Sequence, residues 1–396
     1  MDTFDASAAT GAVALSLASP SRRDRLRRFS DDQWEIELRS GRDRVVARTN
    51  KALPLEKLLD EAIEMTHRAL DLTSIEDVEH LVTRAPADDH IIWRREDGQT
   101  TVRFQAVSDF QIATNTQVEI RRADGTIEHQ ATPPSPAWTS AFRFHRLSQG
   151  NNDLFDAYRN MFLGLEALLD QLWPKGRREQ EKVWLLRAIG AAGARVNLVS
   201  LATQGTPDPC DDLVTRLYDI RVHLFHAKTG RTLIPDERVS YIKVAGAYPV
   251  LVALWTEIVR AWLGLTRGGG VVTYQGFKLL VEKAYGTGRI GLTADDTPPN
   301  ATDSKASPKD MPVTILPQPV TVLEMLPGRM ALTVKTLVSA LPVDLTVRRV
   351  AALLPNGNPA IICGIMGGLT LDGANVFEVF SVVRLINSGQ PRTEFT

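Results

Sequence analysis

The sequence predicts a multidomain α+β protein, in which a central four-helix bundle is flanked by a β-rich N-terminal domain and a small mixed α/β C-terminal domain. Three observations lead to this prediction. The chain has 396 residues, which is more than one typical domain holds. Residues 151–266 contain four successive segments with helical hydrophobic spacing. Strand-like segments precede and follow these four segments.

The composition is that of an ordinary soluble protein, with 43% hydrophobic and 23% charged residues. The formal net charge of -1 gives the whole protein no attraction to nucleic acid or to a membrane surface, so an anion-binding surface would have to be local. The two cysteines, Cys210 and Cys363, are far apart. This spacing excludes a disulfide framework and a cysteine zinc site, and it favours a reducing cytoplasm.

The N-terminal part is expected to comprise a flexible tail at 1–32 and a β-rich α+β domain at 33–148. WEIELRS and RVVART alternate like strands, whereas PLEKLLDEAIEMTHRALDL has helical spacing. Two Asp-Gly pairs, at 97–98 and 124–125, each lie between alternating runs. They predict β-hairpins with type I′ turns, because both central residues of that turn need positive φ.

The four helical segments of 151–266 have apolar stripes that can share one core. They are NNDLFDAYRNMFLGLEALLDQLW, RREQEKVWLLRAIGAAGARVNLVSLA, DPCDDLVTRLYDIRVHLFHAK and DERVSYIKVAGAYPVLVALWTEIVRAWLGL. Short connections favour a four-helix bundle. The fourth segment holds the longest apolar stretch, but Glu257 and Arg260 would be costly in a bilayer, so we expect a buried helix and no membrane contact. Pro249 is expected to kink this helix.

The C-terminal region, 271–396, is expected to mix strands with a helix at GFKLLVEKAYG and to contain a linker at 292–312, which is rich in Pro, Ser, Thr and Asp. Gly286, Gly288 and Gly291 fit the pattern G-x-G-x-x-G. A dinucleotide site needs a strand before this pattern, whereas a helix is predicted there. No cofactor is therefore expected.

The third bundle segment contains LYDIRVHLFHAK, which places Arg221 and His226 near the end of a helix. Cleavage of RNA by its own 2'-hydroxyl group requires a base, an acid and positive donors for the charge that develops on the phosphate. Histidine titrates near neutral pH and can serve in either proton role. Arginine offers a permanently charged fork that matches phosphate oxygens. This route needs no metal.

These residues resemble the HEPN superfamily, whose members are helical bundles with an arginine and a histidine at this R-x4-H spacing. The resemblance covers residues 151–266 only and is greatest to the Apea-like branch. It extends to YRNMFLGLEALL, with Glu166 on the apolar side of the first helix, and to the basic Lys228. The family usually has a polar residue after the arginine. This chain has Val222 there, and His223 one position later.

The resemblance implies a metal-independent endoribonuclease that acts as a homodimer through its bundle. On an ideal helix, Arg221 and His226 would point about 140° apart, at 100° per residue. Either the helix loosens after Leu224, or two copies share a site, as the family resemblance implies. By resemblance, such domains often act in phage defence or toxin systems. Basic residues expected near the RNA cleft are Lys175, Arg177, Arg178 and Lys182, together with Lys228.

Other interpretations stay open. Arg221 could form a structural salt bridge with Glu166 or Asp170, and a histidine at a helix end is commonly stabilised by the helix dipole. Asp219, His223 and His226 share one helical face and could hold zinc, although no fourth ligand is apparent. The chain could also be a non-catalytic binding or assembly protein that regulates a partner. Our leading hypothesis is a cytoplasmic, metal-independent endoribonuclease that binds RNA as a homodimer, with room for a regulatory protein partner.

Overall fold

The computed structural model describes residues 9–29, 33–112, 124–125, 137–226, 232–235, 237–265, 272–387, 391–393 and 395. The chain divides into two compact units. The β unit comprises Met1–Ala113 and Val271–Ser388, with Thr396, and the helical unit comprises Thr114–Gly270 and Gly389–Phe395. The helical unit is thus inserted between two parts of the β unit. The second predicted turn, at 124–125, lies in a segment that is mostly outside the described residues.

The β unit is built on a nine-stranded sheet with the strand order β2-β3-β4-β1-β5-β6-β13-β10-β9. All neighbouring strands are antiparallel except β6 and β13, which are parallel over the whole of β13. The hairpin between β5 and β6 turns at Asp97 and Gly98, which have φ values of 51° and 75°. The predicted type I′ turn is confirmed here. The strands are β1 (Gly11–Ser16), β2 (Arg25–Phe29), β3 (Trp34–Leu38), β4 (Arg44–Thr49), β5 (His90–Glu96), β6 (Gln99–Ile112), β9 (Thr321–Leu326), β10 (Arg329–Leu337) and β13 (Val376–Asn387).

Helix α1 (Leu55–Glu76) covers one face of this sheet and confirms the helix predicted for that segment. Val13 and Leu15 of β1 pack in the same core as Leu58 and Met65 of α1. Ala12 and Ala14 of β1 belong to a different core, because successive side chains of a strand point to opposite faces. The sheet is therefore buried on both sides near β1.

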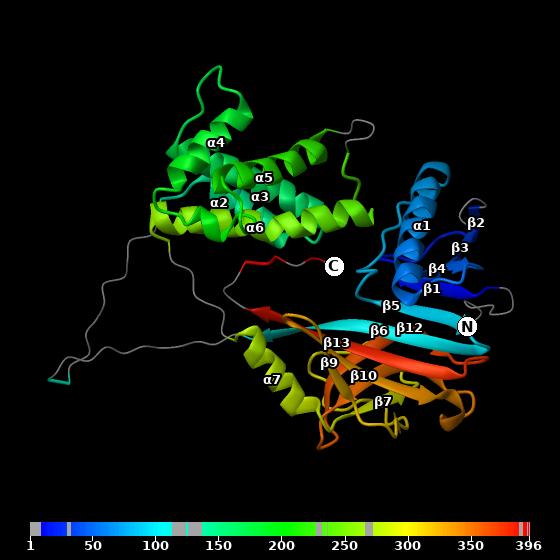
Figure 1. Cartoon of the computed structure of the whole chain (residues 1–396). Coiled ribbons are helices and arrows are strands. Elements are labelled where there is room, and N and C mark those ends of the chain that lie inside the picture. Colours follow the sequence, from blue (N-terminus) through cyan, green and yellow to red (C-terminus); the bar gives the residue numbers. More distant parts are fainter. Residues whose placement is uncertain are drawn as a thin grey trace. The chain divides into compact units, whose positions relative to one another are not determined.

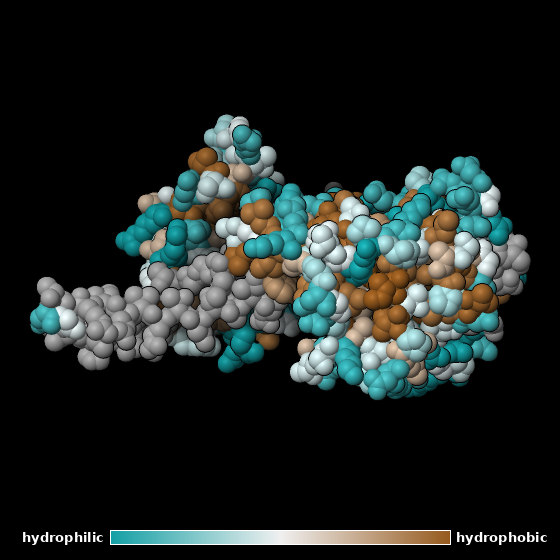
Figure 2. Space-filling model, turned by 90° about the horizontal axis from the view of Figure 1, so that it is seen from below, coloured by the Kyte–Doolittle hydropathy of each residue, from teal (hydrophilic) through white to brown (hydrophobic). Residues whose placement is uncertain are grey.

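The opposite face packs against a second sheet with the order β12-β11-β7-β8. Its strands are β7 (Arg289–Thr293), β8 (Thr314–Ile315), β11 (Thr346–Leu353) and β12 (Pro359–Thr370). Helix α7 (Tyr274–Tyr285) contributes Phe277 and Val281 to the same core. Figure 1 shows α1 on one side of the large sheet, and α7 with β7 on the other. Figure 2 views the molecule from below and shows hydrophobic residues among hydrophilic ones at the surface.

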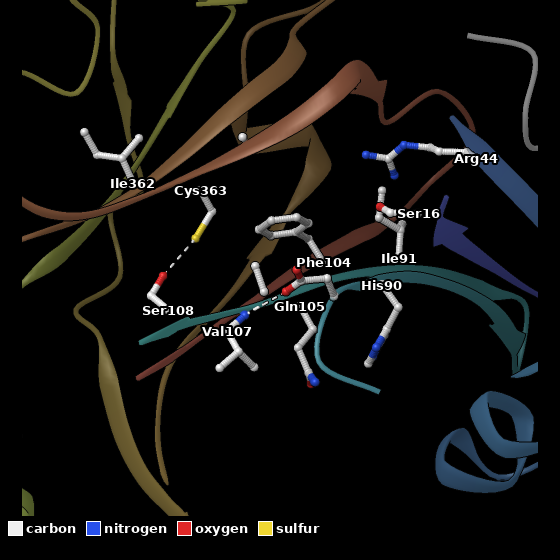
Figure 3. Close-up of a pocket in the computed structure, with 13 residues that line it drawn as sticks. Ser16, Arg44, His90, Ile91, Phe104, Gln105, Val107, Ser108, Ile362 and Cys363 are labelled. Atoms are coloured by element: carbon white, nitrogen blue, oxygen red, sulfur yellow. Dashed lines mark hydrogen bonds between the residues drawn. The ribbon is translucent and has the colours of Figure 1, made fainter. Parts of the chain in front are cut away.

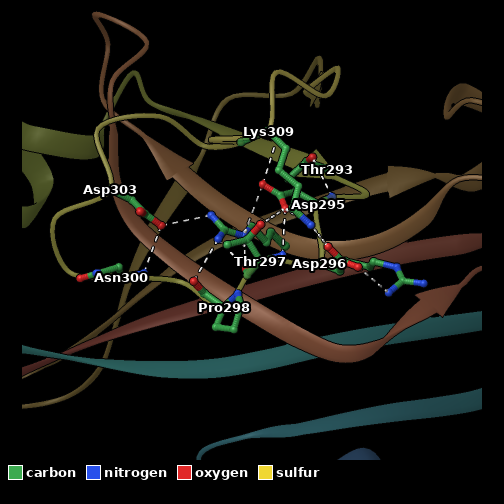
Figure 4. A network of polar contacts seen from close by, with 11 residues as sticks. Thr293, Asp295, Asp296, Thr297, Pro298, Asn300, Asp303 and Lys309 are labelled. Atoms are coloured by element: carbon green, nitrogen blue, oxygen red, sulfur yellow. Dashed lines mark hydrogen bonds and ion pairs between the residues drawn. The ribbon is translucent and has the colours of Figure 1, made fainter.

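The segment between β7 and β8, where we expected a linker, has little regular structure but is packed around the buried Arg349. Figure 4 shows the polar contacts of this segment, with Asp295, Thr297 and Asp303 among the labelled residues. Arg349 of β11 donates from Nε to the Thr297 carbonyl at 2.7 Å and pairs with Asp303 at 3.2 Å. Asp295 is fully buried nearby, with its carboxylate 4.0 Å from Arg349 Nε. Hydrogen bonds from Thr297 and the Arg349 charge outweigh the opposing effect of burial and hold the pKa of Asp295 down to about 2.

The helical unit contains five α-helices within the described residues. They are α2 (Ser140–Gly150), α3 (Leu154–Leu172), α4 (Glu181–Ala192), α5 (Pro209–Phe225) and α6 (Arg238–Leu263), with a 3-10 turn at Leu198–Ser200. Helix α2 was not predicted, and it packs along α3, where Ser148 donates to the Ala157 carbonyl at 2.8 Å. Residues 391–393 and Phe395 also belong to this unit, and Phe395 is buried against Tyr248.

Helix α6 is by length and composition able to cross a membrane, but half of its most apolar window is buried inside the structure. Its buried side chains include Tyr248, Leu251 and Trp255, which pack in the core of the helical unit. This is the buried helix expected for the segment, with Pro249 inside it. These contacts make α6 a core helix of the helical unit.

The predicted fold class is wrong in its architecture. The structure is not a central four-helix bundle with separate β-rich and mixed domains on either side. It has a large, mostly antiparallel nine-stranded sheet that draws strands from both ends of the chain, plus a second sheet. The error arose at the pairing of β6 with β13, whose partners Arg103 and Glu378 are 275 residues apart. Local hydrophobic spacing identifies strands but does not say which distant strands pair.

Candidate functional site

The candidate site lies at the C-terminal end of α5, in the helical unit. Asp208 caps the start of α5 by accepting from the amides of Cys210 and Asp211, both at 3.0 Å, and Pro209 occupies the first turn. Leu217, Ile220 and Leu224 face the core of the unit. This register leaves Arg221 and His223 on the partly exposed side.

Arg221 is anchored by two glutamates from neighbouring helices. Its Nη2 lies 2.8 Å from Oε1 of Glu181, in the first turn of α4, and 3.6 Å from Oε1 of Glu166 on α3. The guanidinium also lies 5.0 Å from the ring centre of Phe225. The Arg221 side chain is 18% exposed, and its Nε is buried without a hydrogen-bond acceptor among the described residues. The arginine is therefore held in one orientation at the surface of the unit.

The two glutamates have pKa values displaced in opposite directions. Burial, followed by the hydrogen bond to Glu181, raises the pKa of Glu166 to about 8. That same hydrogen bond lowers the pKa of Glu181, and Arg221 acts in the same direction. Tyr218 of α5 donates to Glu181 Oε2 at 3.5 Å. The arrangement thus favours the protonated form of Glu166 and the ionised form of Glu181, beside the Arg221 cation.

His226 lies immediately after the last residue of α5. It has an extended backbone, with φ -129° and ψ 101°, and an exposed side chain. The end of the helix is tied down by Arg159, whose Nη2 donates to the Leu224 carbonyl at 3.1 Å, and by Leu233, whose amide donates to the His223 carbonyl at 3.3 Å. Among the described residues, no group hydrogen-bonds or ion-pairs with the imidazole of His223 or His226. The His226 residue is exposed and the His223 residue is partly exposed.

The end of α5 agrees with the first alternative, a helix that loosens after Leu224, and the second alternative, a site shared by two copies, stays a prediction. The helix ends at Phe225, so the angle of about 140° for an ideal helix does not apply to His226. No direct contact joins Arg221 to His226 in this part of the described chain. Arg221 meets Glu166, as one structural alternative anticipated, whereas Asp170 instead accepts from the Lys175 amide at 2.9 Å.

The predicted RNA-binding residues lie before and at the start of α4. Lys175 Nζ lies 5.9 Å from the centre of the Trp184 ring, and its charge acts on both Glu166 and Glu181. Arg177 and Arg178 are exposed and Lys182 is partly exposed, and none of the three has an ion-pair partner among the described residues. Lys228 lies outside the described residues.

The zinc alternative loses its geometric basis. Asp219 and His223 lie within α5, but His226 lies beyond its end, so the three residues do not share one helical face. Within the described ranges no group of three potential metal ligands comes together.

Sequence reasoning missed Glu181 and Tyr218 as members of the site. Tyr218 lies three residues before Arg221 on α5, which is one helical turn. That spacing could have predicted that Tyr218 lies beside Arg221. No sequence pattern predicts the contact of Glu181 with Arg221, because it comes from the packing of α4 against α5.

No family model, curated protein or solved structure matches this chain.

Replacing Glu166 with glutamine is expected to remove a pH dependence from the stability of the helical unit. The pKa of Glu166, about 8 in the folded chain, exceeds its ordinary value of 4.5. Between these values the folded state binds more protons than the unfolded state, so stability falls as pH rises. Glutamine can keep the hydrogen bond to Glu181 without titrating.

Thermal unfolding across this pH range measures the effect. The melting temperature of the wild-type protein should fall with pH relative to that of Glu166→Gln. Asp156→Asn removes an exposed carboxylate from the same helix and should behave like the wild type. Parallel profiles for wild type and Glu166→Gln would contradict the assignment.

Proposed function

We propose that the helical unit is a metal-independent endoribonuclease of HEPN type, with its active site at the C-terminal end of α5. One observation carries the proposal. The exposed imidazole of His226, without a partner among the described residues, follows the helix end closely, and Arg221 is anchored five residues earlier by Glu181 and Glu166. The Arg221–His226 spacing is the one that resembles the family.

The chemistry assigned to these groups is transesterification within the RNA strand. A base removes the proton of the 2'-hydroxyl group, and the 2'-oxygen attacks the adjacent phosphorus. The bond to the 5'-oxygen breaks, and an acid protonates that oxygen. The products are a 2',3'-cyclic phosphate and a 5'-hydroxyl group. His226 supplies proton transfer, and Arg221 stabilises the charge on the pentacoordinate phosphate.

The glutamates support this role by fixing the arginine without cancelling the local positive charge. With Glu166 protonated, Glu181 supplies the single negative charge of the trio, opposite Arg221 and with Lys175 nearby. Glu181 balances the charge of Arg221, so the positive charge in excess near this trio is that of Lys175, although the chain as a whole has a net charge of -1. A local excess of this kind attracts a phosphate.

A homodimer would complete the proton chemistry. The reaction needs a base and an acid, and the tip of one helical unit offers His226 with His223 one turn earlier. A second copy would bring another His226 to the same phosphate. In this proposal Lys175, Arg177, Arg178, Lys182 and Lys228 bind the RNA backbone. The proposal includes a cytoplasmic location and a role in phage defence or a toxin system, with the β unit available to a regulatory partner.

A non-catalytic assembly protein is the second candidate. The observation that favours it is the ion pair between Arg221 and Glu181 at 2.8 Å. This contact uses one nitrogen of the guanidinium that would otherwise bind a phosphate. Val222 favours it as well, because the residue after the arginine is usually polar in the family that the segment resembles.

The test is incubation of the purified full-length protein with mixed RNA in EDTA, followed by analysis of the RNA ends. The proposal predicts 2',3'-cyclic phosphates and 5'-hydroxyl groups, and no cleavage where the nucleotide 5' to the phosphate is 2'-deoxy. Cleavage that stops in EDTA would contradict the metal-independent mechanism. Intact RNA under conditions where the protein is folded and dimeric would favour the assembly protein.

A further inference from the structure

A pocket of about 220 Å³ lies in the β unit, where strands of the large sheet face β12 (Figure 3). It is partly open to solvent. The pocket is lined by residues of both sheets, among them Ser16 of β1, Arg44 of β4, Phe104, Ala106 and Ser108 of β6, and Cys363 of β12. All of them belong to the β unit, so the pocket is independent of the site on α5.

Strand register directs Arg44 into the space between the two sheets. Ser16 and Arg44 are paired across β1 and β4. Ala14 and Val46, two residues along each strand, lie in the core between the sheets, and side chains two apart share a face. Figure 3 shows the Arg44 guanidinium close to Ser16 and pointing into the pocket.

Arg44 has no counterion in this part of the described chain. Its Nε is buried and lacks a hydrogen-bond acceptor, and no described carboxylate pairs with its guanidinium. Burial lowers the pKa of Arg44, and the charge of the neighbouring Asp43, which forms no ion pair with it, acts in the opposite direction. The contrast is Arg48 on the same face of the same strand, which pairs with Glu37 and, at 3.5 Å, with Glu35. Glu37 also pairs with Arg39, so the local carboxylates are already used.

Arg44 is partly buried, and a partly desolvated charge without an ion pair favours a bound anion. The other titratable groups of the pocket do not compensate this charge. Asp89 accepts from the Val107 amide at 2.9 Å, and burial raises its pKa. Figure 3 shows the imidazole of His90 pointing away from the pocket, and burial lowers its pKa to about 4, which keeps the ring neutral.

The rest of the lining is apolar or neutral. Phe104 and Ala106 form one wall, and the opposite wall carries Cys363, whose pKa burial raises to about 11. Ser16 and Ser108 add hydroxyl groups. A dry protein cavity of about 150 Å³ can hold benzene, so this pocket has room for a ring with one small charged group.

We propose that this pocket binds a small organic carboxylate with a compact apolar body, its carboxylate paired with Arg44 and its body against Phe104 and Ala106. The site is a binding site and does not depend on the ribonuclease proposal. Benzoate is the probe, because it combines one carboxylate with one ring.

The experiment is calorimetric titration of the full-length protein with benzoate, benzyl alcohol and inorganic phosphate. Benzoate should bind the wild type. Arg44→Met should weaken binding about tenfold or more, since a hydrogen bond to a charged group is worth about 1.5–3 kcal/mol. Ala106→Phe should abolish binding by filling the pocket. Arg42→Met removes an exposed charge two residues from Arg44 and should leave benzoate affinity unchanged.

Each outcome decides the proposal. Benzoate binding that is equally strong in Arg44→Met would overturn the role of the guanidinium. Phosphate binding without benzoate binding would show a simple anion site and overturn the apolar part. Equal affinity for benzyl alcohol would show that the ligand needs no carboxylate and would contradict the proposed pairing with Arg44. Absence of benzoate binding to folded wild-type protein would reject the proposal as a whole. The melting temperature of each variant establishes that it is folded.

Discussion

His226→Ala is expected to lower the rate of RNA cleavage by about 10²- to 10⁴-fold, the usual contribution of a general acid–base group. The melting temperature should stay close to that of the wild type, because His226 is exposed and its ring has no partner among the described residues. Cleavage of a defined RNA under single-turnover conditions, in EDTA, gives the rate. A pH–rate profile that loses its histidine limb in the variant would identify proton transfer as the missing step.

Two further variants sharpen this test. His80→Ala removes an exposed histidine from the β unit and should cleave at the wild-type rate. Arg221→Lys keeps the charge but loses the fork that matches phosphate, so a large loss of rate is expected with a smaller loss of stability than in Arg221→Ala. If His226→Ala and His80→Ala retain equal activity, the cleavage comes from another site or from a contaminating enzyme.

Arg349→Met is expected to destabilise the β unit by about 3–5 kcal/mol, the cost of removing one partner from a buried ion pair. The Arg349 side chain is 1% exposed and forms an ion pair with Asp303 at 3.2 Å. It also donates hydrogen bonds to the Thr297 and Pro298 carbonyls. Methionine fills much of the same volume but leaves Asp295, which is fully buried, without its nearest arginine. The segment between β7 and β8 would lose its main anchor.

The matched control is Arg348→Met. Arg348 is the preceding residue of β11, and its side chain is 38% exposed, with one ion pair to Asp296 at 3.9 Å. A change within about 0.5 kcal/mol is expected there, as for most surface substitutions. Urea unfolding followed by hydrogen exchange in β11 and β12 reports the β unit separately from the helical unit. Equal stabilities for the two variants would show that the buried network contributes little.

Elements with strong local patterns could be predicted from the sequence. Helices α1, α5 and α6 have apolar residues at helical spacing over several turns, and the Asp97–Gly98 turn needs only two adjacent residues. Helix α2 was missed because the apolar Phe142 and Phe144 flank the charged Arg143. This alternation of apolar and polar residues is typical of a strand. The common sheet was missed because β6 and β13 meet through tertiary packing, with no signal in either segment alone.

The candidate site follows the same division. Arg221, His226 and Glu166 lie in segments whose local pattern resembles a known family, so they could be selected from sequence. Glu181 forms the shortest ion pair to Arg221, yet it reaches that position only because α4 packs beside α5. Arg44 could not have been selected from the sequence. It is a candidate only because the folded chain places it in a pocket where none of the described carboxylates forms an ion pair with it.

The position of β13 has a consequence for synthesis on the ribosome. Its strand lies between β6 and β10, yet residues Val376–Asn387 are translated long after β6 ends at Ile112. At about 5–20 residues per second, the nascent chain carries β6 without this neighbour for roughly 10–50 s. An open strand edge is a template for wrong pairing. The nascent chain therefore needs the emerging helices, or a chaperone, to keep that edge from other chains until its proper neighbour has been made.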